Sequence, residues 1–361
     1  MTANRPPNNI EFAKQLAKRL YSIDTNVIKE LNSYNDRNYH LITNQSSKEF
    51  ILKITNKVEA KHKDEIDAIN AFILHLHNKG FKVTVPVINT NGDYISYEDI
   101  PTDGELDQIN GQKPYAVRLM EFIPGKPLRY VPFTPSLLTE CGLMLAKMTI
   151  ALKDFEAPAL KSRKFPYGVL RALNIRKYLI DVQEVDKRQL INECLDQFNE
   201  SVLSIVHELR HTYIHDDYNE FNIIVGKDSE HRDDEYHMTG LIDFGDVEYG
   251  PRVFDLAVYL AHSMLWFTAG PQILAPGFGI KGYTQLIEMD SNELDVLYYS
   301  IKARLCQSLV NGVHTIRLDP SNTYVFSSQE TGWSALRALH ECQPKDLIKK
   351  CLKILEYNLE L

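Results

Sequence analysis

Short runs of alternating apolar and polar residues mark the first third of the chain, and this period of two is typical of β-strands. Helical repeats of apolar residues occur over residues 10–20 and 63–78. Gly80 follows the second repeat and is the kind of residue that ends a helix. We expect strands over residues 28–34, 38–43, 49–54, 81–88, 94–97 and 115–122. Asn91-Gly92-Asp93 predicts a hairpin between the fourth and the fifth. The pattern predicts a small antiparallel sheet with one packed helix.

The apolar residues change to the helical period in the rest of the chain. We expect helices over residues 135–153, 169–180, 187–209, 252–268 and 291–313, and two more after residue 328. The expected strands 222–225 and 239–242 flank a charged loop, which we interpret as a solvated hairpin tip. Pro124-Gly125-Lys126-Pro127 suits a stiff connector. The predicted class is α+β, with a nucleotide-binding lobe over residues 1–122, a hinge over 123–127 and a helical lobe over 128–361.

Composition narrows the range of partners. Hydrophobic residues make up 44% and charged residues 24% of the 361 residues, enough for a sizeable core. The net charge of −8 argues against a nucleic-acid partner, whose phosphates need a basic surface. The longest apolar stretch, residues 253–269, contains Asp255 and His262, so we expect a buried helix there and no membrane span. The five cysteines form no Cys-x-x-Cys pair and the N-terminus is polar, which favours free thiols and a cytoplasmic location.

Acidic and amide side chains stand at loop positions in two segments of the helical half. The first segment holds Asp217 and, five residues later, Asn222, and the second holds Asp243 at the start of Asp-Phe-Gly. One acid can orient and deprotonate an acceptor hydroxyl while an amide oxygen and a second acid hold Mg²⁺ beside a nucleotide phosphate. Asp217 is therefore the candidate catalytic base, and Asn222 and Asp243 are the candidate Mg²⁺ ligands.

Each of these assignments has a structural alternative. Asp217 lies in a sequence with good turn chemistry, and Asn222 suits the cap of a strand. Asp243 is harder to explain in this way, because an unpaired carboxylate on an apolar strand is costly to bury. A metal hydrolase that uses His211, His215, Asp217 and Asp243 is a further alternative. The two histidines are four residues apart, which suits a metal on a helix, whereas this segment has the pattern of a strand.

The order of these features resembles the aminoglycoside phosphotransferase and choline kinase group, protein-kinase-like enzymes that phosphorylate small alcohols. A β lobe, a Pro-Gly hinge, a helical lobe, His-x-Asp-x-x-x-x-Asn from His215 and Ile-Asp-x-x-Asp from Ile242 carry this resemblance. Longer blocks resemble the hydroxylysine kinases: residues 33–40, 50–56, 117–125, 241–246, 304–310 and 331–333. The last two blocks carry no general kinase chemistry and are the more specific evidence. The resemblance implies a two-lobe kinase-like fold and Mg²⁺-dependent transfer of phosphate from GTP to the side-chain hydroxyl of 5-hydroxy-L-lysine in the cytosol.

The resemblance also assigns residues of the first lobe to the nucleotide. Lys53 fits the lysine that grips the phosphates, although a lysine on such a strand also reaches solvent easily. Asp67 would be its acidic partner, and Glu65 lies close to it in sequence. Asp67 stands where glutamate is more usual, which shortens its reach.

Two further segments complete the expected nucleotide site. Residues 33–38, with Ser33 and Asn35, replace the glycine-rich loop that covers phosphates, and a plain hairpin turn explains them equally well. Met120 and Phe122 would offer backbone hydrogen bonds to the base, although their apolar strand also suits the core.

The resemblance gives the other polar residues of the helical half supporting roles. His215 would orient the loop before the base, and Asp255 would be a structural acid. Asp246 would brace the loop, approach a second metal or cap a helix. Glu248, Asp255 and Arg252 are candidates for binding an acceptor that carries amines and a carboxylate.

One residue departs from the family pattern, which usually has glycine where this chain has Asp216. If both were buried, a second carboxylate beside Asp217 would raise the pKa of at least one of them, so we expect Asp216 to point to solvent or the loop to differ. A kinase for another small amino alcohol, such as an aminoglycoside, choline or a homoserine-like compound, and a nucleotide-binding pseudokinase are the alternative functions.

Overall fold

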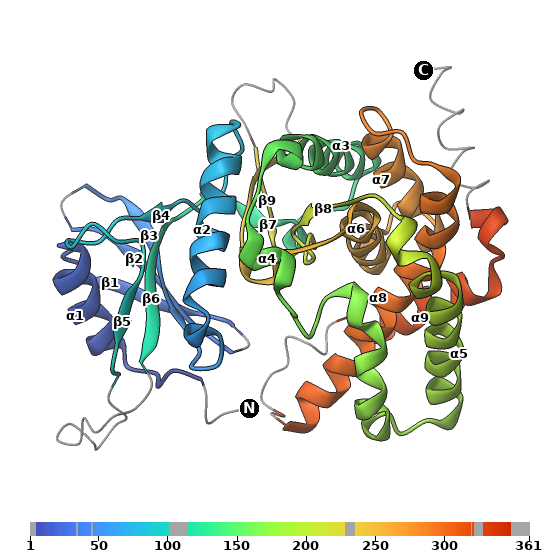
Figure 1. Cartoon of the computed structure of the whole chain (residues 1–361), viewed down its shortest axis with the longest axis horizontal. Coiled ribbons are helices and arrows are strands. Elements are labelled where there is room, and N and C mark those ends of the chain that lie inside the picture. Colours follow the sequence, from blue (N-terminus) through green and yellow to red (C-terminus); the bar gives the residue numbers. More distant parts are fainter. Residues whose placement is uncertain are drawn as a thin grey trace. The chain divides into compact units, whose positions relative to one another are not determined.

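The computed structural model describes residues 5–33, 35–44, 46–100, 114–227, 235–318, 320 and 328–347. The chain divides into two compact units, Met1–Pro124 and Gly125–Leu361, each with its own sheet and core (Figure 1). Tyr34 of the expected phosphate loop, residues 228–234 of the charged hairpin tip, and the chain beyond residue 347 lie outside the described residues.

The N-terminal unit is built on an antiparallel sheet. Its strands pair in the order β1 (Val27–Leu31), β2 (Arg37–Ile42), β3 (Glu49–Thr55), β6 (Tyr115–Glu121) and β4 (Pro86–Val87), and β5 (Ser96–Glu98) also pairs with β6. The predicted strands over 81–88 and 94–97 are therefore shorter than expected. The predicted hairpin between them is wrong, because both pair with β6 and not with each other. The turn at Gly92 is present, with φ +92.

A helix packs on each face of this sheet (Figure 1). Helix α1 (Ile10–Tyr21) begins at Asn9, whose side chain accepts a hydrogen bond from Phe12 N, and it buries four residues against the sheet: Ala13, Leu16, Ala17 and Leu20. Helix α2 (Lys63–Asn78) has the bounds that the apolar repeat predicts, and Gly80 follows it in the left-handed region. Ile66 of α2 packs near Ala116 on the other face.

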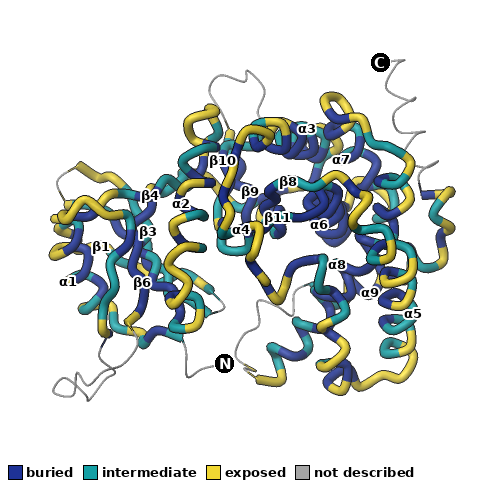
Figure 2. The backbone as a smooth tube through the Cα atoms, in the orientation of Figure 1, coloured by how far each residue is buried: buried dark blue, intermediate teal, exposed yellow. Residues whose placement is uncertain are grey.

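Helices make up most of the C-terminal unit. They are α3 (Pro135–Ala151), α4 (Pro158–Ser162), α5 (Val185–Ser201), α6 (Arg252–Trp266), α7 (Ala275–Tyr283), α8 (Ser291–Leu318) and α9 (Gln329–Glu341). Every residue of α6 from Val253 to Leu265 is buried, as the long apolar stretch predicts (Figure 2). Length and composition alone would let the 20 residues Pro135–Asp154 cross a membrane. Half of that stretch is buried inside the unit, where α3 packs on α7 as a core helix does.

Two small sheets in this unit carry the polar loops. Strands β10 (His237–Leu241), β9 (Ile223–Gly226) and β7 (Lys126–Pro127) form one, and β11 (Glu248–Pro251) and β8 (His211–Ile214) form the other. The antiparallel pairing of β9 with β10 confirms the predicted hairpin. Asp217 and Asn222 lie between β8 and β9, and Asp243 lies between β10 and β11.

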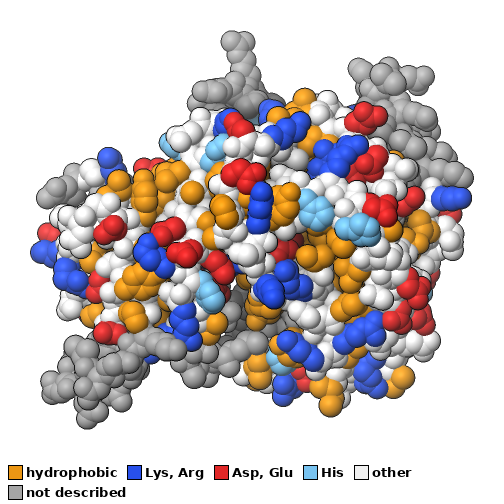
Figure 3. Space-filling model, in the orientation of Figure 1, with side chains coloured by type: hydrophobic (Ala, Val, Ile, Leu, Met, Phe, Trp, Pro, Cys, Tyr) orange, Lys and Arg blue, Asp and Glu red, His pale blue; other side chains and the backbone are white. Residues whose placement is uncertain are grey.

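The helix predictions fail where side chains compete with helical geometry. Residues Val169–Asp181 form a 3₁₀ run and not the expected α-helix, with a non-helical backbone at Arg171, whose side chain reaches across to Glu248. The expected helix over 187–209 ends at Ser201 and continues as the 3₁₀ segment Leu203–Glu208. On the face shown in Figure 3, acidic and basic side chains are interspersed.

Candidate active site

The loop after β8 is held by a buried carboxylate. Asp255, near the start of α6, accepts hydrogen bonds from His215 N at 2.9 Å and Asp216 N at 2.7 Å. The His215 ring accepts from Asp217 N at Nδ1 and donates from Nε2 to Ile242 O. The ring therefore ties the β8–β9 loop to the end of β10, which agrees with the supporting roles expected for His215 and Asp255.

Hydrogen-bond donors surround the Asp217 carboxylate. Oδ1 accepts from Asn219 Nδ2 at 2.7 Å and from Arg304 Nη2 on α8 at 2.5 Å. Oδ2 accepts from Asn222 Nδ2 at 2.8 Å. All three of these contacts are made by donors, one of them the Arg304 guanidinium. The side chain remains 22% exposed, so an acceptor hydroxyl has access to it.

Asn222 joins the two predicted motifs. Its Nδ2 also donates to Asp217 O at 2.9 Å, and its backbone carbonyl accepts from Ile242 N, the residue before Asp243. Because the amide nitrogen is committed to Asp217, the side-chain oxygen is the atom that Asn222 can offer to a metal. The fold thus brings the candidate base and a candidate metal ligand into one hydrogen-bonded unit.

Asp243 follows β10 in the left-handed region, with φ +58, and is exposed. Enclosure, together with the nearby carboxylates of Asp217 and Asp243, raises the pKa of Asp246 well above its ordinary value, while Arg304 and Arg163 act in the opposite direction. A divalent cation would relieve this crowding of carboxylates, and the oxygen donors present are those that Mg²⁺ prefers. The residues of this loop therefore fit a divalent metal.

The described residues form no larger cluster of metal-ligating side chains. Across the described part of the chain, no group of three or more His, Cys, Asp or Glu side chains is arranged to hold a metal. His211 lies at the start of β8, where its Nδ1 bonds to Leu209 O, whereas His215 follows the end of that strand. The metal hydrolase alternative, which needs both histidines on one ion, therefore gains no support.

Lys53 lies on β3 in the N-terminal unit, and the structure corrects the partner predicted for it. Lys53 Nζ lies 3.2 Å from Asp36 Oδ2, in a pair whose side chains are 15% and 13% exposed. Asp67 instead pairs with Lys63 four residues earlier, on the solvent-exposed face of α2. The prediction failed because sequence spacing does not show which face of α2 is turned to the sheet. Asn56 N and Nδ2 both donate to Asp36 Oδ1 and fix this carboxylate.

The loop between β1 and β2 is a hairpin connection with its own hydrogen bonds. Ser33 Oγ donates to Asp36 O at 2.5 Å, and Arg5 donates to Ser33 O at 3.0 Å. Asn35 is half-buried in the same turn. The structure is compatible with both the turn and the phosphate-covering interpretations of this segment.

The segment that was expected to contact the nucleotide base is part of the N-terminal sheet and pairs with neighbouring strands. Met120 is buried in β6, opposite Ile51 and Pro86. Phe122 N donates to Glu49 O at 3.2 Å, and the Phe122 ring stacks on His40. The Phe122 N–H is thus already bonded within the sheet, which leaves the Phe122 carbonyl as the backbone group for the predicted contact.

The structure adds residues that the motif analysis did not single out. Arg304 lies 87 positions from Asp217 in the sequence and donates a hydrogen bond to its carboxylate. The Arg304 side chain is 13% exposed. Its Nε also bonds to His262, which bonds to Glu220. The sequence signal for Arg304 was its place in the block at 304–310, which resembles the hydroxylysine kinases. Arg252 was expected to bind the acceptor substrate. In the structure its side chain makes two hydrogen bonds to buried Glu293.

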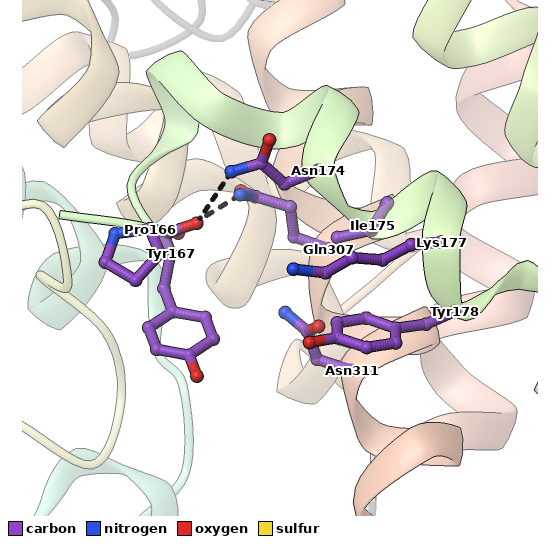
Figure 4. A pocket seen from close by; sticks show the side chains of 8 residues that line it. All are labelled: Pro166, Tyr167, Asn174, Ile175, Lys177, Tyr178, Gln307 and Asn311. Carbon is purple, nitrogen blue, oxygen red and sulfur yellow. Dashed lines mark hydrogen bonds between the residues drawn. The ribbon is translucent and has the colours of Figure 1, made fainter. Parts of the chain in front are cut away.

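A small hollow of about 40 Å³ lies beside the segment that precedes the 3₁₀ run (Figure 4). Gln307, from the same block as Arg304, donates to the carbonyls of Tyr167 and Gly168 at its edge. Asn174 donates to Pro166 O. The block at 304–310 therefore contacts the β8–β9 loop through Arg304 and the segment before the 3₁₀ run through Gln307.

Comparison of the sequence with known proteins identifies a family and several similar kinases. A model of the APH phosphotransferase enzyme family matches residues 27–283. Hydroxylysine kinase of Xenopus laevis is 28% identical over 358 residues, covering 96% of this chain and 93% of the relative. Hydroxylysine kinase of Bos taurus is 28% identical over 340 residues, covering 91% and 88%.

Solved structures share the fold. A microcompartment-associated aminopropanol kinase matches with a TM-score of 0.68 and 15% identity, covering 92% of this chain and 97% of that one. Amicoumacin kinase, solved with AMP-PNP, Ca²⁺ and amicoumacin, gives 0.64 and 17%, covering 91% and 94%. The predicted α+β kinase-like fold is confirmed. With the family model matched over more than half of the sequence, the chain belongs to the APH phosphotransferase family and is a small-molecule kinase.

Proposed function

We propose that this kinase transfers the γ-phosphate of GTP to the side-chain hydroxyl of 5-hydroxy-L-lysine in the presence of Mg²⁺. The support for this acceptor is the similarity to hydroxylysine kinases from several vertebrates, at 25–28% identity over at least 90% of the chain. The four described cysteines are free and buried, which suits a reducing compartment, and we infer a cytoplasmic location.

The observation that carries the assignment of roles is the double hydrogen bond from Asn222 Nδ2 to Asp217. It fixes the Asp217 carboxylate and leaves the Asn222 oxygen for the metal. Asp217 then accepts the proton of the acceptor hydroxyl as the bond to phosphorus forms. Asn222 and Asp243 would hold Mg²⁺, which supplies positive charge against the phosphates when it is bound.

Arg304 and Asn219 maintain the geometry of the base. Their bonds to Asp217 Oδ1 restrict rotation of the carboxylate, so that Oδ2 and the exposed edge face the acceptor. In the N-terminal unit, Lys53 is the residue that we assign to the nucleotide phosphates, with Asp36 orienting its ammonium group. We assign Met120 and Phe122 to contacts with the guanine base of the nucleotide. We assign Ser33 and Asn35 to the segment that covers its phosphates.

The proposal is tested with the purified full chain and labelled GTP or ATP. The acceptors are 5-hydroxy-L-lysine, lysine, 1-amino-2-propanol, choline and an aminoglycoside. We expect Mg²⁺-dependent transfer to 5-hydroxy-L-lysine, none to lysine, and a fall in kcat of about 10²–10⁴-fold in Asp217→Asn, because general base catalysis is worth this much. The exposed Asp196→Asn on α5 is the matched control.

Each alternative function has its own outcome in this assay. Transfer that is faster to another amino alcohol would replace the acceptor while keeping the kinase. Nucleotide binding without transfer to any acceptor would support a pseudokinase. Full activity in Asp217→Asn would remove the role assigned to Asp217.

A further inference from the structure

Asp216, which stands where the family usually has glycine, is buried and does not point to solvent as one expectation had it. Its side chain is 1% exposed, and its φ of +58 lies in the left-handed region that favours glycine. Aspartate tolerates this region better than most residues do. The left-handed turn explains the family's glycine, but it leaves open what the carboxyl group does in this chain.

Two buried carboxylate oxygens beside this turn have no hydrogen-bond donor. They are Asp216 Oδ2 and Glu248 Oε1, the latter on β11, whose side chain is also 1% exposed. Both would lie under 3.0 Å from a Cβ atom at Gly168, so they face the same small space. The other oxygens are engaged: Glu248 Oε2 accepts from Arg171 at 2.7 Å, and Asp216 Oδ1 is 3.5 Å from Val169 N.

Two acceptors that border the same small space without a donor are costly in a buried site. A single proton resolves both, because a protonated carboxyl group is a donor as well as an acceptor. We propose that Asp216 is held as a neutral carboxylic acid whose O–H donates to the Glu248 carboxylate, and that this shared proton positions the loop that carries Asp217. The kinetic part of this proposal rests on the proposed kinase function, whereas the protonation does not.

The charges around Asp216 and Glu248 favour the state in which the two carboxyl groups together bind one proton. Burial, with the carboxylates of Glu248, Asp255 and Asp246, raises the pKa of Asp216 well above its ordinary value, and Arg304 on α8 opposes this. Burial also raises the pKa of Glu248, while Arg171 and Arg163 lower it. Among the described residues no cation forms an ion pair with Asp216, whereas Arg171 forms one with Glu248. The proton therefore belongs on Asp216, and the negative charge stays on Glu248.

The shared proton would tie three segments together. Asp216 belongs to the β8–β9 loop, Glu248 to β11, and Gly168 to the segment before the 3₁₀ run. Gln307 on α8 donates to two carbonyls of that segment, those of Tyr167 and Gly168. A Cβ at Gly168 would displace both carboxyl groups from their present positions. Asp216 is therefore a positioning residue, which acts through the backbone of its neighbour Asp217.

The proposal predicts a pH dependence with a definite sign. A carboxyl group whose pKa is raised by folding binds its proton more tightly in the folded state. Its contribution to the free energy of unfolding is fully present below the unfolded-state pKa of 3.8 and is lost as the pH rises through the raised folded-state pKa. When the proton leaves, two carboxylates repel each other beside the catalytic loop, so kcat falls on the same alkaline limb.

The test compares the full-length wild type with Asp216→Asn and Glu248→Gln. In Asp216→Asn the amide still donates to Glu248 but does not titrate, and asparagine tolerates the left-handed turn. We expect the infrared absorption of protonated carboxyl groups at neutral pH to lose one component in this variant. We also expect both variants to show a flatter dependence of the free energy of unfolding on pH, with Asp196→Asn as the exposed control that changes neither.

Kinetics then separates positioning from substrate binding. We expect Asp216→Asn to remove the alkaline fall of kcat while KM for the acceptor changes by less than about twofold, because a positioning residue acts on the chemical step. An unchanged infrared spectrum or an unchanged pH slope would overturn the shared proton. A selective rise in KM for an amino alcohol over the matching diol would show that Asp216 binds the acceptor's ammonium group, and would overturn the positioning role. If the wild type transfers no phosphate, the spectral and unfolding results still decide the protonation.

Discussion

The individual residues of the loop owe their properties to charges that they meet through the fold. Asp217 and Asp243 lie close enough to Asp246 to raise its pKa, and the Arg304 cation opposes this effect. Two unit charges in contact near a protein surface interact by about 4 kcal/mol at an effective dielectric constant of 20. Arg304 therefore matters more to this loop than a typical surface arginine would.

We predict that Arg304→Gln lowers kcat by about 10- to 100-fold, because the base loses the cation that fixes its Oδ1 and a small misplacement of a reacting group is costly. Arg304→Lys should recover part of the loss, since it restores the charge without the planar fork. Steady-state kinetics with saturating nucleotide measures the effect.

Arg317→Gln, on the same helix but 56% exposed and paired with Asp181, is the matched control. Equal losses of kcat in Arg304→Gln and Arg317→Gln would mean that α8 as a whole had been disturbed, and would contradict a specific role for Arg304.

Among the elements, the α3–α7 contact shows most directly how sequence permits packing. A Cβ at Gly282 would lie under 3.0 Å from Thr139 O and Leu143 N, and one at Gly142 would lie equally close to the backbone of Gly279. These are backbone atoms, which cannot move aside by changing rotamer. Glycine at these positions lets two helices approach more closely than side chains would allow.

We predict that Gly282→Ala destabilises the protein by about 1–3 kcal/mol, the usual cost of overpacking. The higher helix propensity of alanine alone would stabilise the helix by up to about 1 kcal/mol relative to glycine. The clash must therefore cost more than this for Gly282→Ala to lower the free energy of unfolding. Urea unfolding of the free protein measures the difference. Gly270→Ala is the control, because the nearest atom to its Cβ is Phe267 Cε1 at an ordinary 3.5 Å. A stabilised Gly282→Ala protein would refute the close contact.

At the scale of the whole molecule, nucleotide binding should be visible as stability. A ligand that binds only the folded state at 100 times its Kd adds about 2.7 kcal/mol to the free energy of unfolding. We therefore expect Mg²⁺ with GTP to raise Tm, and omission of Mg²⁺ to reduce the rise. Thermal unfolding followed by fluorescence measures both.

The same measurement tests the corrected partner of Lys53. Lys53→Met should abolish most of the rise in Tm, whereas Lys63→Met, which removes the exposed partner of Asp67, should keep it. Loss of the rise in Lys63→Met alone would reverse the assignment.

Much of the element structure follows from local pattern. The bounds of α2 and the strand β3 match their expected ranges closely, because an amphipathic period is a short-range property of the chain. The predictions of which strands pair with each other were less successful. The strands β4 and β5 were expected to pair with each other, and both lie on β6. Helix α7 escaped notice because its three glycines hide an apolar period.

The sequence alone determined the family, the division into a strand-rich and a helical half, and the spacing that places Asp217 and Asn222 on one loop and Asp243 on another, since each depends on residues close together in the chain. Only the tertiary structure decided the partners, which are Asp36 for Lys53 and Arg304 for Asp217. Charges and hydrogen bonds act through space over a few ångströms, and packing sets those distances. Residues that are 87 positions apart can therefore complete one carboxylate's environment without leaving any periodic signal in the sequence.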